Sequence, residues 1–236
     1  MTEVSPFEPW RAQHLMVLGV TCAASAVAVW VGRSQQMRHV VPWLSGALAA
    51  VLVGAEIAAL CYTIQRGEWT IAGGLPLQIC DVAVYVIAVA LLTRHQRSYE
   101  LAYFWGLSGT IHGLLTPDLV IGFPHPACLK FFVTHVGIIV SVIYLSAGLG
   151  LRPGPAAVRR MMIVTNLYVA MVGIINAWLG TNYLYLCRPP SAPSLIDYLG
   201  PWPWYIFGLE VVALVSFTLC AAPFWLAAHT VGERSE

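Results

Sequence analysis

Two side chains in this sequence could carry nucleophilic chemistry: the thiol of Cys80 and the imidazole of His135. Cys80 lies in Leu75-Pro76-Leu77-Gln78-Ile79-Cys80-Asp81, the polar opening of an otherwise apolar segment. His135 occupies the first turns of another apolar segment. A thiol and an imidazole within reach of each other can act as a nucleophile and its base. Whether the two can meet depends on the segments that carry them.

The composition is that of a membrane protein. Of the 236 residues, 58% are hydrophobic and only 10% are charged, and the mean hydropathy is +0.73. Soluble domains carry about 25% charged residues. Apolar runs of about 20 residues recur, which is the length that crosses ~30 Å of hydrocarbon. We therefore expect an all-α, polytopic membrane protein, and the net charge of +1 gives no indication of a nucleic-acid partner.

Seven transmembrane helices are expected, and they leave little chain for a soluble domain. The predicted spans are 15–32, 41–62, 75–93, 99–116, 131–150, 158–183 and 204–228. Residues 1–13 form an N-terminal tail, 14–229 the seven-helix transmembrane domain, and 230–236 a C-terminal tail. The first span is not typical of a signal peptide, because Glu3 and Glu8 precede Arg11, whereas a signal peptide starts positively charged.

The distribution of Arg and Lys predicts the orientation. Eight basic residues follow spans 1, 3, 5 and 7, namely Arg33, Arg38, Arg94, Arg97, Arg152, Arg159, Arg160 and Arg234. Four lie on the opposite side, namely Arg11, Arg66, Lys130 and Arg188. By the positive-inside rule the N-terminus is outside and the C-terminus is cytoplasmic. The expected location is the cell membrane, which is the inner membrane if the source is bacterial.

With alternating spans, the polar residues of six spans fall in the outer half of the bilayer. They are Glu56, Gln78, Cys80, Asp81, His112, His135, Asn176, Asn182 and Glu210. Ionisable side chains in hydrocarbon cost about 2.5–3.5 kcal/mol each on insertion scales, so they persist where they have partners or a function. At 1.5 Å per residue, Cys80 and His135 each lie roughly 7–8 Å below the start of their spans. Their depths therefore match.

Each of these residues also has a purely structural interpretation. Cysteine is commonly a buried apolar filler, and an intramembrane histidine is often a hydrogen-bonded strut. Glu56 and Glu210 could pair with His112 or with an asparagine, or remain protonated, and Asn176 and Asn182 could bind neighbouring backbone. The gathering of polar groups at one depth favours a functional site over these separate explanations.

Two further possibilities concern the cysteines and metal binding. Cys128 and Cys187 fall in the long outer connections, where they could form a disulfide or remain free thiols. Two histidines and several carboxylates could hold zinc, but no HxxxH or ExxH pair is present. We therefore expect no metal and no organic cofactor.

Several motifs, taken in order along the chain, resemble a known family. They are Glu56, Leu75-Pro76-Leu77 with Cys80-Asp81, the Gly113-to-Pro117 stretch, Phe132 with His135, Asn176, Gly180-Thr181-Asn182-Tyr183 and Trp202-Pro203-Trp204-Tyr205. Together they resemble the YwaF-like family of seven-helix integral membrane proteins. The resemblance implies a relation to eukaryotic membrane cysteine acyltransferases, which move fatty acyl chains between phospholipids, with Cys80 and His135 as the catalytic pair.

The expected function is that of a lipid acyltransferase or acyl hydrolase that works through an acyl-thioester on Cys80. His135 would be the base, with phospholipids or lysophospholipids as partners. Glu56 or Asp81 would orient His135, and Gln78 or Asn182 could stabilise an oxyanion. His112, Asn176, Tyr183 and Glu210 would support the site or bind substrate. The alternative is a seven-helix receptor or transporter with a polar pocket in the outer half of the bilayer.

Overall fold

The computed structural model describes residues 6–117, 119, 121–190 and 195–232. Its regular elements are all helices joined by turns and irregular loops, apart from an isolated bridge between Pro6 and Ile121. The α-helices are α1 (Ala12–Arg33), α2 (Val41–Gln65), α3 (Ile79–Thr93), α4 (Gln96–Trp105), α5 (Ile111–Leu115), α6 (Pro126–Ile143), α7 (Ala157–Leu179) and α8 (Trp204–Gly232). Two π-helices, η2 (Gly106–Thr110) and η3 (Tyr144–Gly148), extend α4 and α6. Short 3₁₀ turns are η1 (Gln35–Met37), η4 (Tyr183–Tyr185) and η5 (Leu195–Tyr198).

Five helices among the described residues are long and apolar enough to cross a membrane. They are Ala12–Arg33, Val41–Gln65, Pro126–Gly148, Ala157–Leu179 and Trp204–Leu226. The prediction of an all-α, multi-pass membrane protein is thus confirmed. The predicted spans 75–93 and 99–116 are not among the five. Residues 75–78 precede α3, which has only 15 residues, and the second region is divided into α4, η2 and α5.

The chain separates into two compact units. Unit 1 comprises Met1–Trp69 and Ile79–Leu151, and unit 2 comprises Thr70–Gln78 and Arg152–Glu236. The predicted boundaries 1–13, 14–229 and 230–236 stay predictions, and residues 1–5 and 233–236 of the two tails lie outside the described residues. Unit 1 holds α1 to α6, and unit 2 holds α7 and α8.

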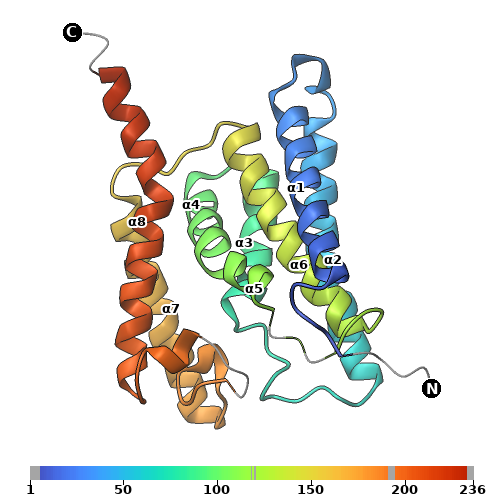
Figure 1. The fold of residues 1–236 in the computed structure, drawn as a ribbon, viewed down its shortest axis with the longest axis vertical. Coiled ribbons are helices and arrows are strands. Elements are labelled where there is room, and N and C mark those ends of the chain that lie inside the picture. The colour runs from blue at the N-terminus through green and yellow to red at the C-terminus, as the bar shows by residue number, and fades with distance from the viewer. Residues whose placement is uncertain (1–5, 118, 120, 191–194, 233–236) are drawn as a thin grey trace. The chain divides into compact units, whose positions relative to one another are not determined.

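Helix α6 is the centre of unit 1. It packs against α1, α2 and α3 (Figure 1). Of the most apolar stretch of α6, 61% is buried, against 22% for α1 and for α2. The fully buried side chains of unit 1 include Ile138 on α6 itself and Leu52, Ile87 and Tyr99 on other helices. The buried face of α6 is therefore held by several helices at once.

Glycines let the helices of unit 1 approach closely, as Gly32 and Gly106 illustrate. A Cβ on Gly32 of α1 would lie 2.8 Å from the carbonyl carbon of Gly148 in η3. A Cβ on Gly106 of η2 would lie 2.9 Å from Cγ2 of Val142 in α6. Close backbone approach through small residues is the usual way that membrane helices pack.

In unit 2, hydrogen bonds join residues 71–77, which precede α3, to tyrosines in and just after α7. The Tyr183 hydroxyl donates to the carbonyl of Ile71 (2.7 Å) and accepts from the backbone N–H of Leu75 (3.0 Å). The Tyr168 hydroxyl of α7 donates to the carbonyl of Leu77 (2.7 Å). These bonds satisfy backbone groups of the Leu75–Leu77 stretch outside any helix, which explains why the segment is ordered without being helical.

Candidate functional site

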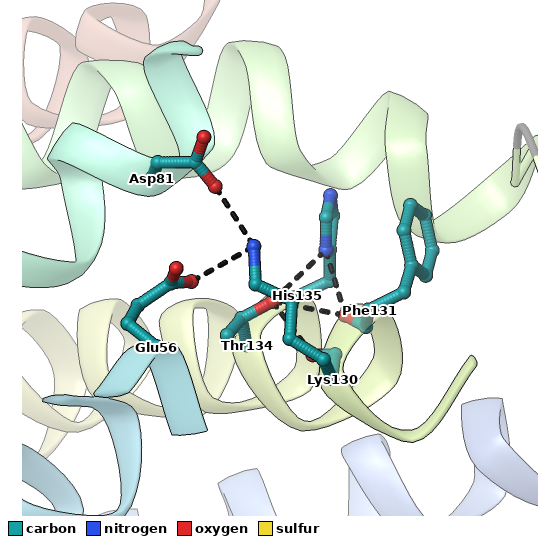
Figure 2. A network of polar contacts seen from close by, with 6 residues as sticks. All are labelled: Glu56, Asp81, Lys130, Phe131, Thr134 and His135. Atoms are coloured by element: carbon teal, nitrogen blue, oxygen red, sulfur yellow. Dashed lines mark hydrogen bonds and ion pairs between the residues drawn. The ribbon is translucent and has the colours of Figure 1, made fainter. Parts of the chain in front are cut away.

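A partly buried group of three ionisable side chains joins α2, α3 and α6 of unit 1 (Figure 2). Lys130 Nζ of α6 is 2.8 Å from Asp81 Oδ1 of α3 and 3.0 Å from Glu56 Oε1 of α2. The exposed fractions of the side chains are 28% for Lys130, 15% for Asp81 and 10% for Glu56. We call Glu56, Asp81 and Lys130 the Lys130 cluster. It joins three helices through one ammonium group.

The Lys130 cluster holds the N-terminal turns of α3 and α6 beside each other. Asp81 is in the first turn of α3, where a carboxylate is favoured by the positive end of the helix dipole. Lys130 is in the first turns of α6, where a cation is unfavourable, and the two carboxylates compensate for this. Because Cys80 adjoins Asp81 and His135 lies five residues after Lys130, the cluster places both at the same ends of α3 and α6.

The hydrogen bonds of His135 define its tautomer. Its Nδ1 lies 2.8 Å from the carbonyl oxygen of Phe131 and 3.4 Å from Thr134 Oγ1. A carbonyl oxygen can only accept, so Nδ1 carries the proton and Nε2 keeps a free lone pair. The ring also stacks on Phe131 with the centroids 3.9 Å apart. Figure 2 shows the imidazole and the Lys130 ammonium projecting from the same side of α6.

Gly113 of α5 faces the unprotonated nitrogen of His135. A Cβ built on Gly113 would lie 2.9 Å from His135 Nε2 and 3.0 Å from Cδ2. The space beside Nε2 therefore depends on the absence of a side chain at position 113. His135 itself is only 7% exposed. The imidazole is enclosed, with a glycine backbone at its basic edge.

Cys80 is brought to this region without being bonded to His135. The charges of Asp81 and Lys130 act on both Cys80 and His135. Among the described residues, no hydrogen bond joins the thiol to the imidazole. Catalytic hydrogen bonds are often formed only in the complex with substrate. The arrangement places a thiol and an imidazole near one end of two neighbouring helices.

The asparagines of unit 2 bind backbone within their own unit. Asn176 Oδ1 accepts from the Thr181 hydroxyl (2.7 Å) and from the N–H of Tyr183 (2.8 Å), and its Nδ2 donates to the carbonyl of Tyr183 (2.8 Å). Asn182 Oδ1 accepts from the N–H groups of Cys187 and Arg188. Both residues thereby order the chain that follows α7.

The remaining predicted site residues are also used locally or are exposed. Gln78 Oε1 accepts from the N–H of Leu184 at 3.3 Å, and Glu210 accepts from Asn166 Nδ2 at 2.9 Å, both within unit 2. His112 is exposed on α5 of unit 1. Glu56 is paired with Lys130 rather than with His112 or an asparagine. The polar residues of the predicted outer cluster thus divide between the two units.

All six cysteines are free. Of the two alternatives for Cys128 and Cys187, the structure therefore shows free thiols, with Cys128 fully buried in the apolar cluster of Phe7, Leu114 and Phe132. In the part of the chain that the structure describes, no three His, Cys, Asp or Glu side chains group as metal ligands would.

Sequence reasoning missed two residues of unit 1, Lys130 as a member of the site and His14. Lys130 is the sole lysine of the chain, and its place at the start of a span, like that of Asp81, was a usable signal for their ion pair. His14 is fully buried near the start of α1, and the sequence gives no signal of its distant partner.

The helices and the buried ion-pair cluster define a helical multi-pass membrane protein. The chain belongs to the TMEM164 family, whose model matches residues 9–221. No curated protein and no solved structure matches it.

The family match corrects the resemblance suggested by the motifs, because the TMEM164 family is not a YwaF-like family. The pieces between Glu56 and Tyr205 all lie inside the matched residues. Short runs of Pro, Gly and aromatic residues at helix ends satisfy general demands of membrane helices. Their order and spacing were therefore less specific to one family than they appeared.

Proposed function

We propose that this protein is a membrane-embedded thiol enzyme that transfers or hydrolyses the acyl groups of membrane lipids. Cys80 is the nucleophile and His135 is the general base. The partners are phospholipids or lysophospholipids, which can reach unit 1 from the surrounding bilayer. The proposal rests on the geometry of unit 1 and on the chemistry of its residues.

The tautomer of His135 is the observation that carries the proposal. A histidine that donates from Nδ1 to a backbone carbonyl is held in the form in which Nε2 can accept a proton. The same imidazole is enclosed at the end of α6 where the Lys130 cluster brings the start of α3. Nδ1 is bonded to the carbonyl of Phe131, while Nε2 lies beside the backbone of Gly113 and is the nitrogen that can take a proton.

In the first half of the reaction, the proton of the Cys80 thiol passes to His135 Nε2 and Sγ bonds to the ester carbonyl carbon of a lipid. The carbonyl oxygen takes the electron pair. When it reforms the double bond, the bond to the glycerol oxygen breaks, and that oxygen takes the proton from Nε2. The products are an acyl-thioester on Cys80 and a lysolipid.

In the second half, the hydroxyl of a lysolipid or water attacks the thioester carbonyl and gives its proton to Nε2. The carbon–sulfur bond breaks, and the thiolate of Cys80 recovers the proton from His135. The first turn of α3 contributes backbone N–H groups without partners inside the helix, which suit the oxyanion. These steps need no metal and no organic cofactor.

The proposal includes seven membrane crossings, with α3 and the α4–η2–α5 region as the additional two. The N-terminus is outside and the C-terminus is cytoplasmic, as the basic residues predict. In this orientation the starts of α3 and α6 face the outer leaflet of the cell membrane. Acyl chains would lie against the apolar helix surfaces beside Cys80.

Acyl exchange in proteoliposomes tests the proposal. Wild-type protein is incubated with phospholipid that carries an isotope-labelled acyl chain and with unlabelled lysophospholipid. Labelled chain should move to the lysolipid or appear as free fatty acid, and Cys80→Ser and His135→Ala should each abolish this. Cys61→Ser, an exposed cysteine on α2, is the control and should retain activity. No acyl movement in wild type would contradict the proposal and favour a binding or transport function.

A further inference from the structure

We infer that His14 is a positioning residue for the base His135, acting through the turn of α5 that carries Gly113. The inference rests on the proposed function for its catalytic meaning. All of its residues belong to unit 1. It links α1 to the site through one hydrogen bond and one backbone contact.

His14 is completely buried and both of its ring nitrogens are engaged. Its Nδ1 accepts from the backbone N–H of Trp10 at 3.0 Å, and its Nε2 donates to the carbonyl oxygen of Leu114 at 2.8 Å. The donor and acceptor roles follow from the partners, because an N–H only donates and a carbonyl only accepts. The ring also contacts Phe7 edge-on at 5.7 Å. The histidine is thus fixed in one tautomer and one orientation.

The carbonyl oxygen of Leu114 needs a hydrogen-bond donor from outside its helix, and His14 supplies it. The last carbonyls of a helix have no partner inside it, and α5 has only five residues after the π-helix η2. α5 is the last part of the continuous helical stretch formed by α4, η2 and α5, so Leu114 lies in its final turn. The carbonyl of Leu114 is bonded instead by a side chain 100 residues earlier. This bond fixes the turn of α5 against the N-terminal part of α1.

The residue before Leu114 is Gly113, which forms the wall at His135. With a Cβ at position 113, that atom would be only 2.9 Å from His135 Nε2. The backbone of Gly113 therefore sets how the imidazole sits and how much space is left beside its basic nitrogen. A shift of the last turn of α5 therefore moves the Gly113 backbone relative to His135. His14 can influence His135 in this way without a hydrogen bond between the two histidines.

Two substitutions of His14 distinguish the effect of its hydrogen bonds from the effect of its ring size. His14→Gln keeps a side-chain donor for Leu114 and an acceptor for Trp10, whereas His14→Phe keeps a ring and loses both bonds. Gly113→Ala places a methyl group on the wall directly. His39→Phe at an exposed histidine and Gly109→Ala are controls, since a Cβ at Gly109 meets only Ile79 at 4.0 Å.

The first measurement is the rate of acyl transfer from phospholipid to lysophospholipid in proteoliposomes. His14→Phe and Gly113→Ala should lower kcat about 10–100-fold, the scale of a misplaced catalytic group, with KM changed little. His14→Gln, His39→Phe and Gly109→Ala should stay near wild type. Equal loss in His14→Gln and His14→Phe would contradict a role that depends on the hydrogen bond.

The second measurement does not depend on activity. Two-bond proton–nitrogen spectra of ¹⁵N-histidine-labelled protein in micelles report the tautomer of each histidine, and His135→Ala assigns the signal of His135. His14→Phe and Gly113→Ala should shift that signal, and the controls should not. If His14→Phe does not fold, Gly113→Ala still decides, because an unmoved His135 signal and an unchanged rate would overturn the inference.

The two proposals can fail separately. No acyl transfer by wild type, together with shifted His135 signals in the variants, would overturn the proposed function and keep the positioning of His135 by His14. Acyl transfer by wild type with unmoved signals in both variants would overturn the positioning alone.

Discussion

At the scale of single residues, the Lys130 cluster places one cation between two carboxylates in a partly buried setting. Buried ion pairs add little stability over apolar residues, but removal of one partner leaves the other charge without compensation. Lys130 lies within 3.0 Å of both Glu56 and Asp81. The cluster therefore holds the starts of α3 and α6 together. Its intact ion pairs add little net stability, but removal of one partner is expected to destabilise the fold.

Lys130→Met is expected to destabilise the protein by about 3–5 kcal/mol, because Glu56 and Asp81 would face each other without a cation. Thermal unfolding in detergent measures this loss. The triple variant with Glu56→Gln and Asp81→Asn added should recover most of it, since no buried charge remains. A Lys130→Met protein as stable as wild type would show that the ion pairs do not form.

The span positions predict that Cys80, His135, Glu56 and Asp81 lie at one depth, and the structure pairs Glu56 and Asp81 with Lys130. The sequence could not assign the ion pairs, since these depend on the lateral positions of α2, α3 and α6. For the same reason Asn176 and Asn182 seemed to be site candidates, whereas their side chains bind the turn after α7. The depth of a residue in the membrane can be predicted by counting along its helix. Which residues of other helices lie beside it cannot be predicted in this way.

At the scale of the elements, α1 and the end of α6 meet through two glycine backbones. A methyl group on Gly32 would lie 2.8 Å from the carbonyl carbon of Gly148, and a backbone atom cannot turn aside as a side chain can. Glycine is required at position 32 because any side chain would clash with the backbone of Gly148, and not because of its backbone dihedral angles.

Gly32→Ala should lower the free energy of unfolding by about 1–3 kcal/mol, the usual cost of overpacking. Gly19→Ala on the same helix is the matched control, because a Cβ there meets nothing within 4 Å. That change should be neutral or stabilise the helix by up to about 1 kcal/mol. Equal thermal unfolding of the two variants would contradict the close approach of α1 to η3.

Hydropathy predicted the five long helices well, because a run of about 20 apolar residues has few alternatives to a membrane helix. It did not predict the start of α3 at Ile79, which follows from hydrogen bonds between residues 71–77 and the tyrosines of unit 2. Nor did it predict η2, since no local signal separates the π-helix from the helices that flank it.

At the scale of the whole molecule, the number of crossings depends on α3 and the α4–η2–α5 region. At 1.5 Å per residue the 15 residues of α3 span about 22 Å, less than the ~30 Å of a typical hydrocarbon core. Its preceding segment 75–78 would have to complete the crossing. The family match over residues 9–221 covers both regions but does not count the crossings.

Reporter fusions test the seven-crossing topology. Alkaline phosphatase fused after Thr93 should be inactive, because the proposed topology puts the end of α3 in the cytoplasm. A fusion after Arg66 should be active, since it lies outside after α2. An active fusion at Thr93 would show that α3 does not cross and would reduce the number of spans to five.

The central claim is that Cys80 carries an acyl group during turnover, and intact-protein mass spectrometry tests it most directly. Wild type, Cys80→Ser and His135→Ala are purified in phospholipid and weighed before and after hydroxylamine. The account predicts an acyl adduct on wild type that maps to Cys80, is removed by hydroxylamine and is absent from both variants. An adduct that persists in Cys80→Ser, or none on wild type under conditions of lipid turnover, would contradict it.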